Sequence, residues 1–131
     1  MSNKVKSSQD TPKILSEIAE LALAKKANEV IGIDVRGLTS FVDYFLICSA
    51  DTEPQVKAIA DNIRRGTPSK PWHLEGYEHS RWVLLDYIDV LVHVFRSEER
   101  EYYSLEKLWA DAPTIPFEDE NLNIKRQKMF D

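Results

Sequence analysis

Residues 75–95, EGYEHSRWVLLDYIDVLVHVF, contain two strand-like apolar runs, 82–85 and 90–95, joined by a short polar break. Runs of this length that are rich in Val, Leu, Trp and Phe are typical of paired β-strands that are buried on at least one face. We therefore predict a β-hairpin at the centre of the domain and place the other elements around it.

The segment before this hairpin predicts a helix followed by two strands. Thr11 can cap a helix whose first turn accepts Pro12, and apolar residues then recur at helical spacing. This stripe consists of Ile14, Leu15, Ile18, Leu21 and Ala22. Residues 29–36 then alternate between apolar and polar, and Gly37 supplies a turn. Residues 43–50 form a nearly continuous apolar run, which indicates a central strand covered on both faces.

A second helix, a connection and a last helix complete the pattern. Thr52 suits a helix cap with Pro54 in the first turn, and 66–71 carries the Gly, Ser and Pro residues of a connection. A short strand near 72–74 precedes the hairpin, and a last helix is expected at 99–110. The predicted order is α-β-β-α-β-β-β-α, an α+β (α/β) domain with a mixed five-stranded sheet and flanking helices.

The length of 131 residues and the hydrophobic share of 43% suit a single domain with one core. We expect a flexible N-terminus at 1–10, the domain at 11–112 and a mobile C-terminal tail at 113–131. The first residues do not resemble a signal peptide, and no apolar run approaches the roughly 20 residues that a bilayer requires. A cytoplasmic protein without a membrane partner is therefore the expectation.

The formal charge of −5 and the pI near 5.2 disfavour a protein that holds naked nucleic acid, because phosphate neutralisation requires clustered Lys and Arg. A protein partner or a local basic patch remains compatible with this balance. Cys48 is the single cysteine, which excludes an intrachain disulfide, and its apolar surroundings indicate a small core residue.

The sequence lacks the motifs of phosphate loops, dinucleotide sites, zinc proteases, serine hydrolases and paired cysteines. His93 lies inside an apolar run without a second His or Cys at ligand spacing, which favours a structural histidine over a metal ligand. Asp86 and Asp89 could bind Mg²⁺ with a nucleotide, but both flank a tight turn, where Asp commonly accepts backbone amides. We therefore expect no metal, cofactor or catalytic residue, and a Mg²⁺-dependent nucleotidyltransferase is the less favoured alternative.

Both faces of the segment 82–87 are apolar. Strand alternation places Trp82, Leu84 and Asp86 on one face and Val83, Leu85 and Tyr87 on the other. If helices cover one side of the sheet, the opposite row is left to form a contact surface, which Trp and Tyr commonly anchor. If helices cover both sides, all of these side chains are core, and periodicity does not decide between the two arrangements.

Four ordered blocks of the sequence resemble the ribosomal silencing factor family, also called RsfS or Iojap-related. The blocks are LTSFVDYFLICSA at 38–50, QVKAIAD at 55–61, EGYEHSRWVLLDYIDVLVHVF at 75–95 and REYYSLEKLW at 100–109. The resemblance runs from residue 14 to about residue 109, and the tail beyond 112 is not covered.

The resemblance implies a nucleotidyltransferase-like sheet that lacks the catalytic residues of that superfamily, and a factor that is not an enzyme. Such a factor binds the fourteenth large-subunit ribosomal protein, in the universal naming, on the intersubunit face of the large subunit. Its body then blocks the small subunit sterically, which represses translation when nutrients are scarce. The alternatives are a role in large-subunit assembly and a dimeric scaffold, since members of the family are often homodimers.

The partner-binding patch of the family corresponds here to Trp82, Leu84, Leu85, Asp86 and Tyr87, with Glu75 and Gly76 beside them. Two departures concern the surroundings of this patch: the connection 64–71 is short for the family, and Ile88 stands where glycine is common. Net negative charge would oppose loose binding to RNA and favour one complementary protein patch. Reversing Glu75 or Asp86 to Lys is therefore expected to weaken binding.

Overall fold

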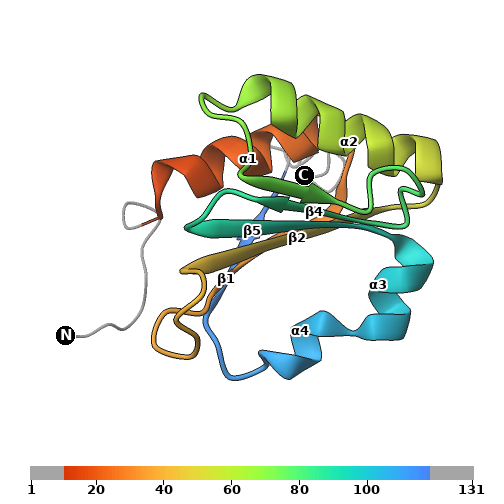
Figure 1. Cartoon of the computed structure of the whole chain (residues 1–131). Coiled ribbons are helices and arrows are strands. Elements are labelled where there is room, and N and C mark those ends of the chain that lie inside the picture. The colour runs from red at the N-terminus through yellow and green to blue at the C-terminus, as the bar shows by residue number, and fades with distance from the viewer. Residues whose placement is uncertain (1–10, 119–131) are drawn as a thin grey trace, which may run out of the picture.

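The computed structural model describes residues 11–118 as one α/β unit built on a single sheet (Figure 1). Its elements are α1 Lys13–Ala24, β1 Asn28–Asp34, β2 Tyr44–Ala50, α2 Glu53–Gly66, β3 His73–Glu75, β4 Trp82–Asp86, β5 Val90–Arg96, α3 Ser97–Tyr103, α4 Leu105–Leu108 and β6 Thr114–Phe117. The predicted order of elements is confirmed as far as α3, and the flexible segment predicted at 1–10 lies outside the described residues.

The sheet is mixed and has six strands in the order β3-β4-β5-β2-β1-β6. The parallel pair β2 and β5 lies at its centre, and the other neighbouring strands are antiparallel. The predicted hairpin is confirmed as β4 and β5, with Trp82 opposite Phe95 and Asp86 opposite Leu91. The nearly continuous apolar run at 43–50 contains β2, and all seven residues of this strand are buried, as expected for a central strand covered on both faces.

The prediction of five strands was one short, because Thr114–Phe117 form β6 against β1. In this strand Ile115 and Phe117 alternate toward the core, while Pro116 suits an edge strand because its missing N–H is not needed there. The tail predicted from 113 therefore begins with an ordered strand, and residues 119–131 lie outside the described part of the chain.

Helices cover the two faces of the sheet unequally (Figure 1). The long helices α1 and α2 lie together on one face and enclose the larger core, which includes Leu15, Ile59, Leu46 and Val92. On the other face the short helices α3 and α4 pack Leu105 and Trp109 against a smaller cluster around Ile33, Phe45, Ile47 and Phe95. Both faces are thus partly covered. Because α3 and α4 are short, the face that they cover is more open on the side of β3 and β4.

Helix ends match the sequence patterns at α2 and differ at α1 and α3. Thr52 caps α2 by accepting the Gln55 amide at 3.2 Å, as predicted. Pro12 rather than Thr11 is the N-cap of α1, and no side chain in residues 11–118 caps this helix, so the prediction for Thr11 was wrong. The last helix begins earlier than predicted and is divided, because Ser104 takes a left-handed conformation (φ 47°) between α3 and α4.

Within residues 11–118, none of the helices has the length and apolar character needed to span a lipid bilayer.

Candidate protein-binding face of the sheet

Strand β4 has one buried row and one accessible row. Val83 and Leu85 are fully buried on the face of the sheet that α1 and α2 cover, whereas Trp82, Leu84 and Asp86 are partly accessible on the opposite face. The Trp82 row therefore provides the available surface, because α3 and α4 lie over the neighbouring strands and only partly over β4.

The short strand β3 adds two side chains to this surface. Glu75 is the cross-strand partner of Leu84, and His73 is the partner of Asp86, so both lie on the same face as the Trp82 row. We call this set the open face: Trp82, Leu84, Asp86, Glu75 and His73. Leu84 is its apolar centre, with Glu75 beside it on β3 and Asp86 two residues farther along β4. Sequence reasoning missed His73 because the register of β3 against β4 was not known.

Trp82 is held by contacts at several positions. Its ring is stacked on Phe95 with 4.8 Å between centroids, and Tyr103 of α3 lies 4.8 Å away on a tilted plane. Its indole Nε1 donates a hydrogen bond to Nδ1 of His93 at 3.1 Å. Trp82 is therefore a fixed aromatic side chain at the boundary between the open face and the α3 cover.

Two residues predicted in the partner patch lie on the other face. Leu85 is fully buried in the main core, so it is not a surface contact. Tyr87 packs partly against the same core, and its hydroxyl lies 2.9 Å from Oγ1 of Thr67 at the end of α2. Burial raises the pKa of Tyr87, while the hydrogen bond with Thr67 opposes this shift. Leu85 and Tyr87 were predicted in the partner patch because they belong to the same continuous block of sequence as Trp82. The pleat of a strand, however, divides such a block between two faces.

Gly76 has a conformational role beside the open face. Its φ of +77° lies in the region that glycine adopts readily, and a Cβ at this position would collide with the carbonyl oxygen of Trp82. The turn that follows is closed by the Ser80 amide, which donates to the Gly76 carbonyl at 3.0 Å. Gly76 thus permits the close approach of β3 and β4 that brings Glu75 next to Leu84.

Asp86 combines surface exposure with a role in the hairpin turn. Its Oδ1 accepts the Ile88 amide at 2.8 Å, which confirms the turn interpretation of this carboxylate. Ile88 occupies the left-handed region with φ 75°, a conformation that a β-branched residue rarely adopts. Within residues 11–118, no group of three or more His, Cys, Asp or Glu side chains is arranged to hold a metal ion.

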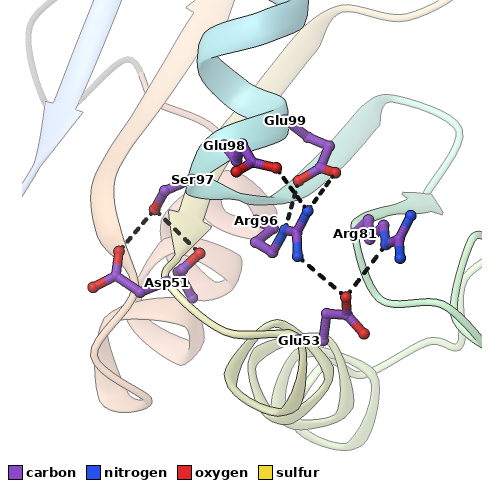
Figure 2. Close-up of polar contacts among 8 residues, drawn as sticks. Asp51, Glu53, Arg81, Arg96, Ser97, Glu98 and Glu99 are labelled. Atoms are coloured by element: carbon purple, nitrogen blue, oxygen red, sulfur yellow. Dashed lines mark hydrogen bonds and ion pairs between the residues drawn. The ribbon is translucent and has the colours of Figure 1, made fainter.

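The carboxyl ends of the parallel strands β2 and β5 are the place where open α/β sheets commonly bind ligands. Figure 2 shows this place closed by the chain's own side chains: Arg96 donates to Glu99 at 2.8 Å and to Glu53 at 3.3 Å. The hydrogen bond with Glu99 raises the pKa of Arg96 and lowers the pKa of Glu99. Ser97 donates to the carboxylate of Asp51 at 2.9 Å. These contacts satisfy the polar groups at this place, where carboxylates outnumber arginines.

The buried side chains of Cys48 and His93 are chemically quiet. Burial raises the pKa of the Cys48 thiol to about 12, so it is not a nucleophilic thiolate at neutral pH. Burial lowers the pKa of His93 to about 3, and its ring lies edge-on to Phe45 with 5.1 Å between centroids. His93 is a neutral structural histidine with an indole partner, as its place in an apolar strand predicted.

Comparison with known proteins places these features in a family. The family model described as "Ribosomal silencing factor during starvation" matches residues 8–130. A Halalkalibacterium halodurans protein named ribosomal silencing factor RsfS is 47% identical over 97 residues, which are 72% of this chain and 83% of that protein. The Bacillus subtilis protein of the same name is 46% identical over 94 residues, 68% of this chain and 78% of that protein.

The chain belongs to the ribosomal silencing factor family. The match extends beyond the residues 14–109 on which the resemblance rested, and it includes the β6 segment. The fold of this RsfS family member is also similar to a crystal structure of a Chromobacterium violaceum protein, with a TM-score of 0.73 and 32% identity over 75% of this chain and 84% of that chain.

Proposed function

We propose that this RsfS family member represses translation by binding the large ribosomal subunit and sterically preventing the small subunit from joining it. The proposed docking partner is the fourteenth large-subunit protein, in the universal naming, and the proposed docking surface is the open face. The observation that carries this surface is the division of β4, in which Val83 and Leu85 are buried while Trp82, Leu84 and Asp86 are partly accessible.

The chemistry of the open face suggests the chemistry of its partner. Leu84 offers an apolar centre, and Glu75 on the neighbouring strand and Asp86 farther along β4 lie on the same face. Apolar centres with charged rims are the common organisation of protein–protein interfaces. A protein patch with a small apolar depression and Lys or Arg at its edge would complement this surface, and the net charge of −5 would oppose loose association with RNA.

The proposed action needs no catalysis. The ligand position at the ends of β2 and β5 is occupied by ion pairs among Arg96, Glu53 and Glu99, and Asp86 serves the hairpin turn. A protein that acts by occupying the intersubunit side of a ribosomal subunit would work in the cytoplasm, where ribosomal subunits join. Association of two copies through the open face is the competing arrangement, and it would be in equilibrium with docking.

The docking face is tested by Leu84→Asp. A carboxylate in the apolar centre would lose its hydration on binding, which is unfavourable. We therefore expect at least tenfold lower affinity for purified large subunits, measured by co-sedimentation. The matched control is Leu108→Asp, since Leu108 is a leucine of α4 with 75% of its surface exposed outside the open face. This control should bind as the wild-type protein does.

Two readouts accompany this comparison. Light scattering during subunit joining should show inhibition by the wild type and by Leu108→Asp, and little by Leu84→Asp. Sedimentation of the protein without subunits reports whether Leu84→Asp instead separates two copies. Equal binding of large subunits by all three proteins, each folded by circular dichroism, would contradict docking through the open face.

A further inference from the structure

The hydrogen bond between Trp82 and His93 links the open face to the interior of the sheet. Trp82 lies opposite Phe95, and His93 is two residues before Phe95, so the indole reaches diagonally across the strand pair. The indole N–H is the one polar group of a tryptophan side chain, and here it points to Nδ1 of His93 at 3.1 Å. The surface that Trp82 offers to a partner is consequently apolar.

His93 makes this hydrogen bond at an energetic cost to the fold. The residue is 4% exposed and lies among aromatic rings, with Phe45 and Phe95 at centroid distances of 5.1 and 6.0 Å. Because Nδ1 accepts, the neutral ring carries its proton on Nε2, and this atom is buried without a hydrogen-bond partner among residues 11–118. A buried unsatisfied donor is unfavourable, and a phenylalanine ring of similar size would avoid it.

We infer that His93 is a positioning residue of the docking face: it accepts the Trp82 indole N–H, fixes the ring, and makes Trp82 present only apolar surface to the partner. This inference rests on the proposed docking through the open face. It adds that the partner surface against Trp82 is apolar and supplies no hydrogen-bond acceptor. Without His93 the indole N–H would be desolvated at the interface without a partner, which lowers affinity.

Three substitutions separate the acceptor from the ring. His93→Asn retains an acceptor close to the position of Nδ1, because the Asn carbonyl oxygen is attached to the same carbon as that nitrogen. His93→Gln places its carbonyl oxygen one bond farther out, nearer the position of Nε2, and His93→Phe keeps the ring without any acceptor. We expect His93→Asn to bind the isolated fourteenth large-subunit protein within about twofold of the wild type, and His93→Phe to bind about tenfold more weakly.

A spectroscopic readout distinguishes positioning from general stability. The indole N–H resonance of Trp82, assigned as the one missing in Trp82→Phe, should keep its slow hydrogen exchange in His93→Asn. In His93→Phe and His93→Gln it should exchange faster. Binding is compared at a temperature where each variant is fully folded by circular dichroism, so that a loss of stability does not enter the affinity.

The decisive comparison uses a Trp82→Phe background, in which there is no indole N–H to hold. There His93→Phe and His93→Asn should bind equally, and an undiminished tenfold difference between them would overturn the inference. Normal binding by His93→Phe in the wild-type background would overturn it as well. If Trp82→Ala binds normally, docking through the open face is itself wrong. If Trp82→Ala weakens binding while His93→Phe does not, the role of His93 alone is wrong.

Discussion

His93 has a pKa of about 3 in the folded protein, whereas the ordinary value for histidine is 6.5. Between these two values the unfolded chain binds a proton that the folded protein does not bind. The free energy of unfolding therefore falls as the pH drops through this window. The contribution of His93 to this loss is about 2 kcal/mol between pH 7 and pH 5.

Urea unfolding of the wild type and of His93→Phe at both pH values measures this contribution. The substitution removes the titrating group, while the carboxylates remain in both proteins, so the difference between the two pH dependences isolates the imidazole. We expect His93→Phe to be the less sensitive protein by about 2 kcal/mol. Parallel pH dependences would contradict a strongly lowered pKa for His93.

At the scale of single residues, the sequence predicted the open face only in part. Alternation correctly separates Trp82, Leu84 and Asp86 from Val83 and Leu85, but it does not say which row the helices cover. That choice depends on where α1 and α2 pack, which is a tertiary property. The role of His93 as a hydrogen-bond acceptor could not be predicted from the sequence either, because it depends on the register of β4 against β5.

At the scale of elements, Arg100 joins the α3–α4 cover to the sheet. This arginine is 8% exposed and donates to both carboxylate oxygens of Glu106, at 3.2 and 2.9 Å. It also donates to Ser49 Oγ of β2 at 3.1 Å and to the Asn28 carbonyl of β1 at 3.3 Å. One side chain therefore holds α3, α4 and two strands in a fixed relation.

Arg100→Ala should destabilise the protein by about 2 kcal/mol, because it removes a buried cation that pairs with Glu106 and donates to Ser49 Oγ and to the Asn28 carbonyl. Chemical denaturation monitored by circular dichroism measures this loss. The control is Lys107→Ala, an exposed cation of the neighbouring short helix α4, which should change stability by less than about 0.5 kcal/mol. Equal stabilities for the two variants would show that the contacts of Arg100 do not hold the α3–α4 cover.

The elements that the sequence misplaced share a physical cause. A single helix was predicted where α3 and α4 are separated by Ser104, because a left-handed residue in the middle of an apolar stripe has no local signal when it is not glycine. Strand β6 was assigned to the tail because four residues with a proline carry little strand signal by themselves. Pairing with β1, more than 80 residues earlier, gives this segment its structure.

At the scale of the whole molecule, the acidic surface should matter for the rate of docking. Charges at the rim of an interface mainly change the association rate, and salt screens them. Glu75 is the cleaner test of this effect, because Asp86 also accepts the Ile88 amide and its reversal would disturb the hairpin turn. Glu75→Lys alters the charge of the open face without removing a turn contact.

We expect Glu75→Lys to associate several-fold more slowly with the isolated fourteenth large-subunit protein at low salt, with a smaller difference at high salt. Stopped-flow fluorescence at two ionic strengths gives both rates. Glu20→Lys is the matched control, since it makes the same change of charge on the exposed side of α1, across the sheet from the open face. If both reversals slow association equally, net charge rather than the open face governs the rate.

The parallel pair at the centre of the sheet has a consequence for how the chain reaches its fold. β1 pairs with β2, and β3, β4 and β5 pair in sequence order, so both groups form from neighbouring segments. The two groups meet only where Tyr44–Ala50 joins Val90–Arg96, which requires closing a long loop and slows folding. During synthesis β2, whose seven residues are all buried in the folded protein, leaves the ribosome well before its partner β5 exists. That interval is when the nascent chain is most exposed to aggregation through an unpaired strand edge.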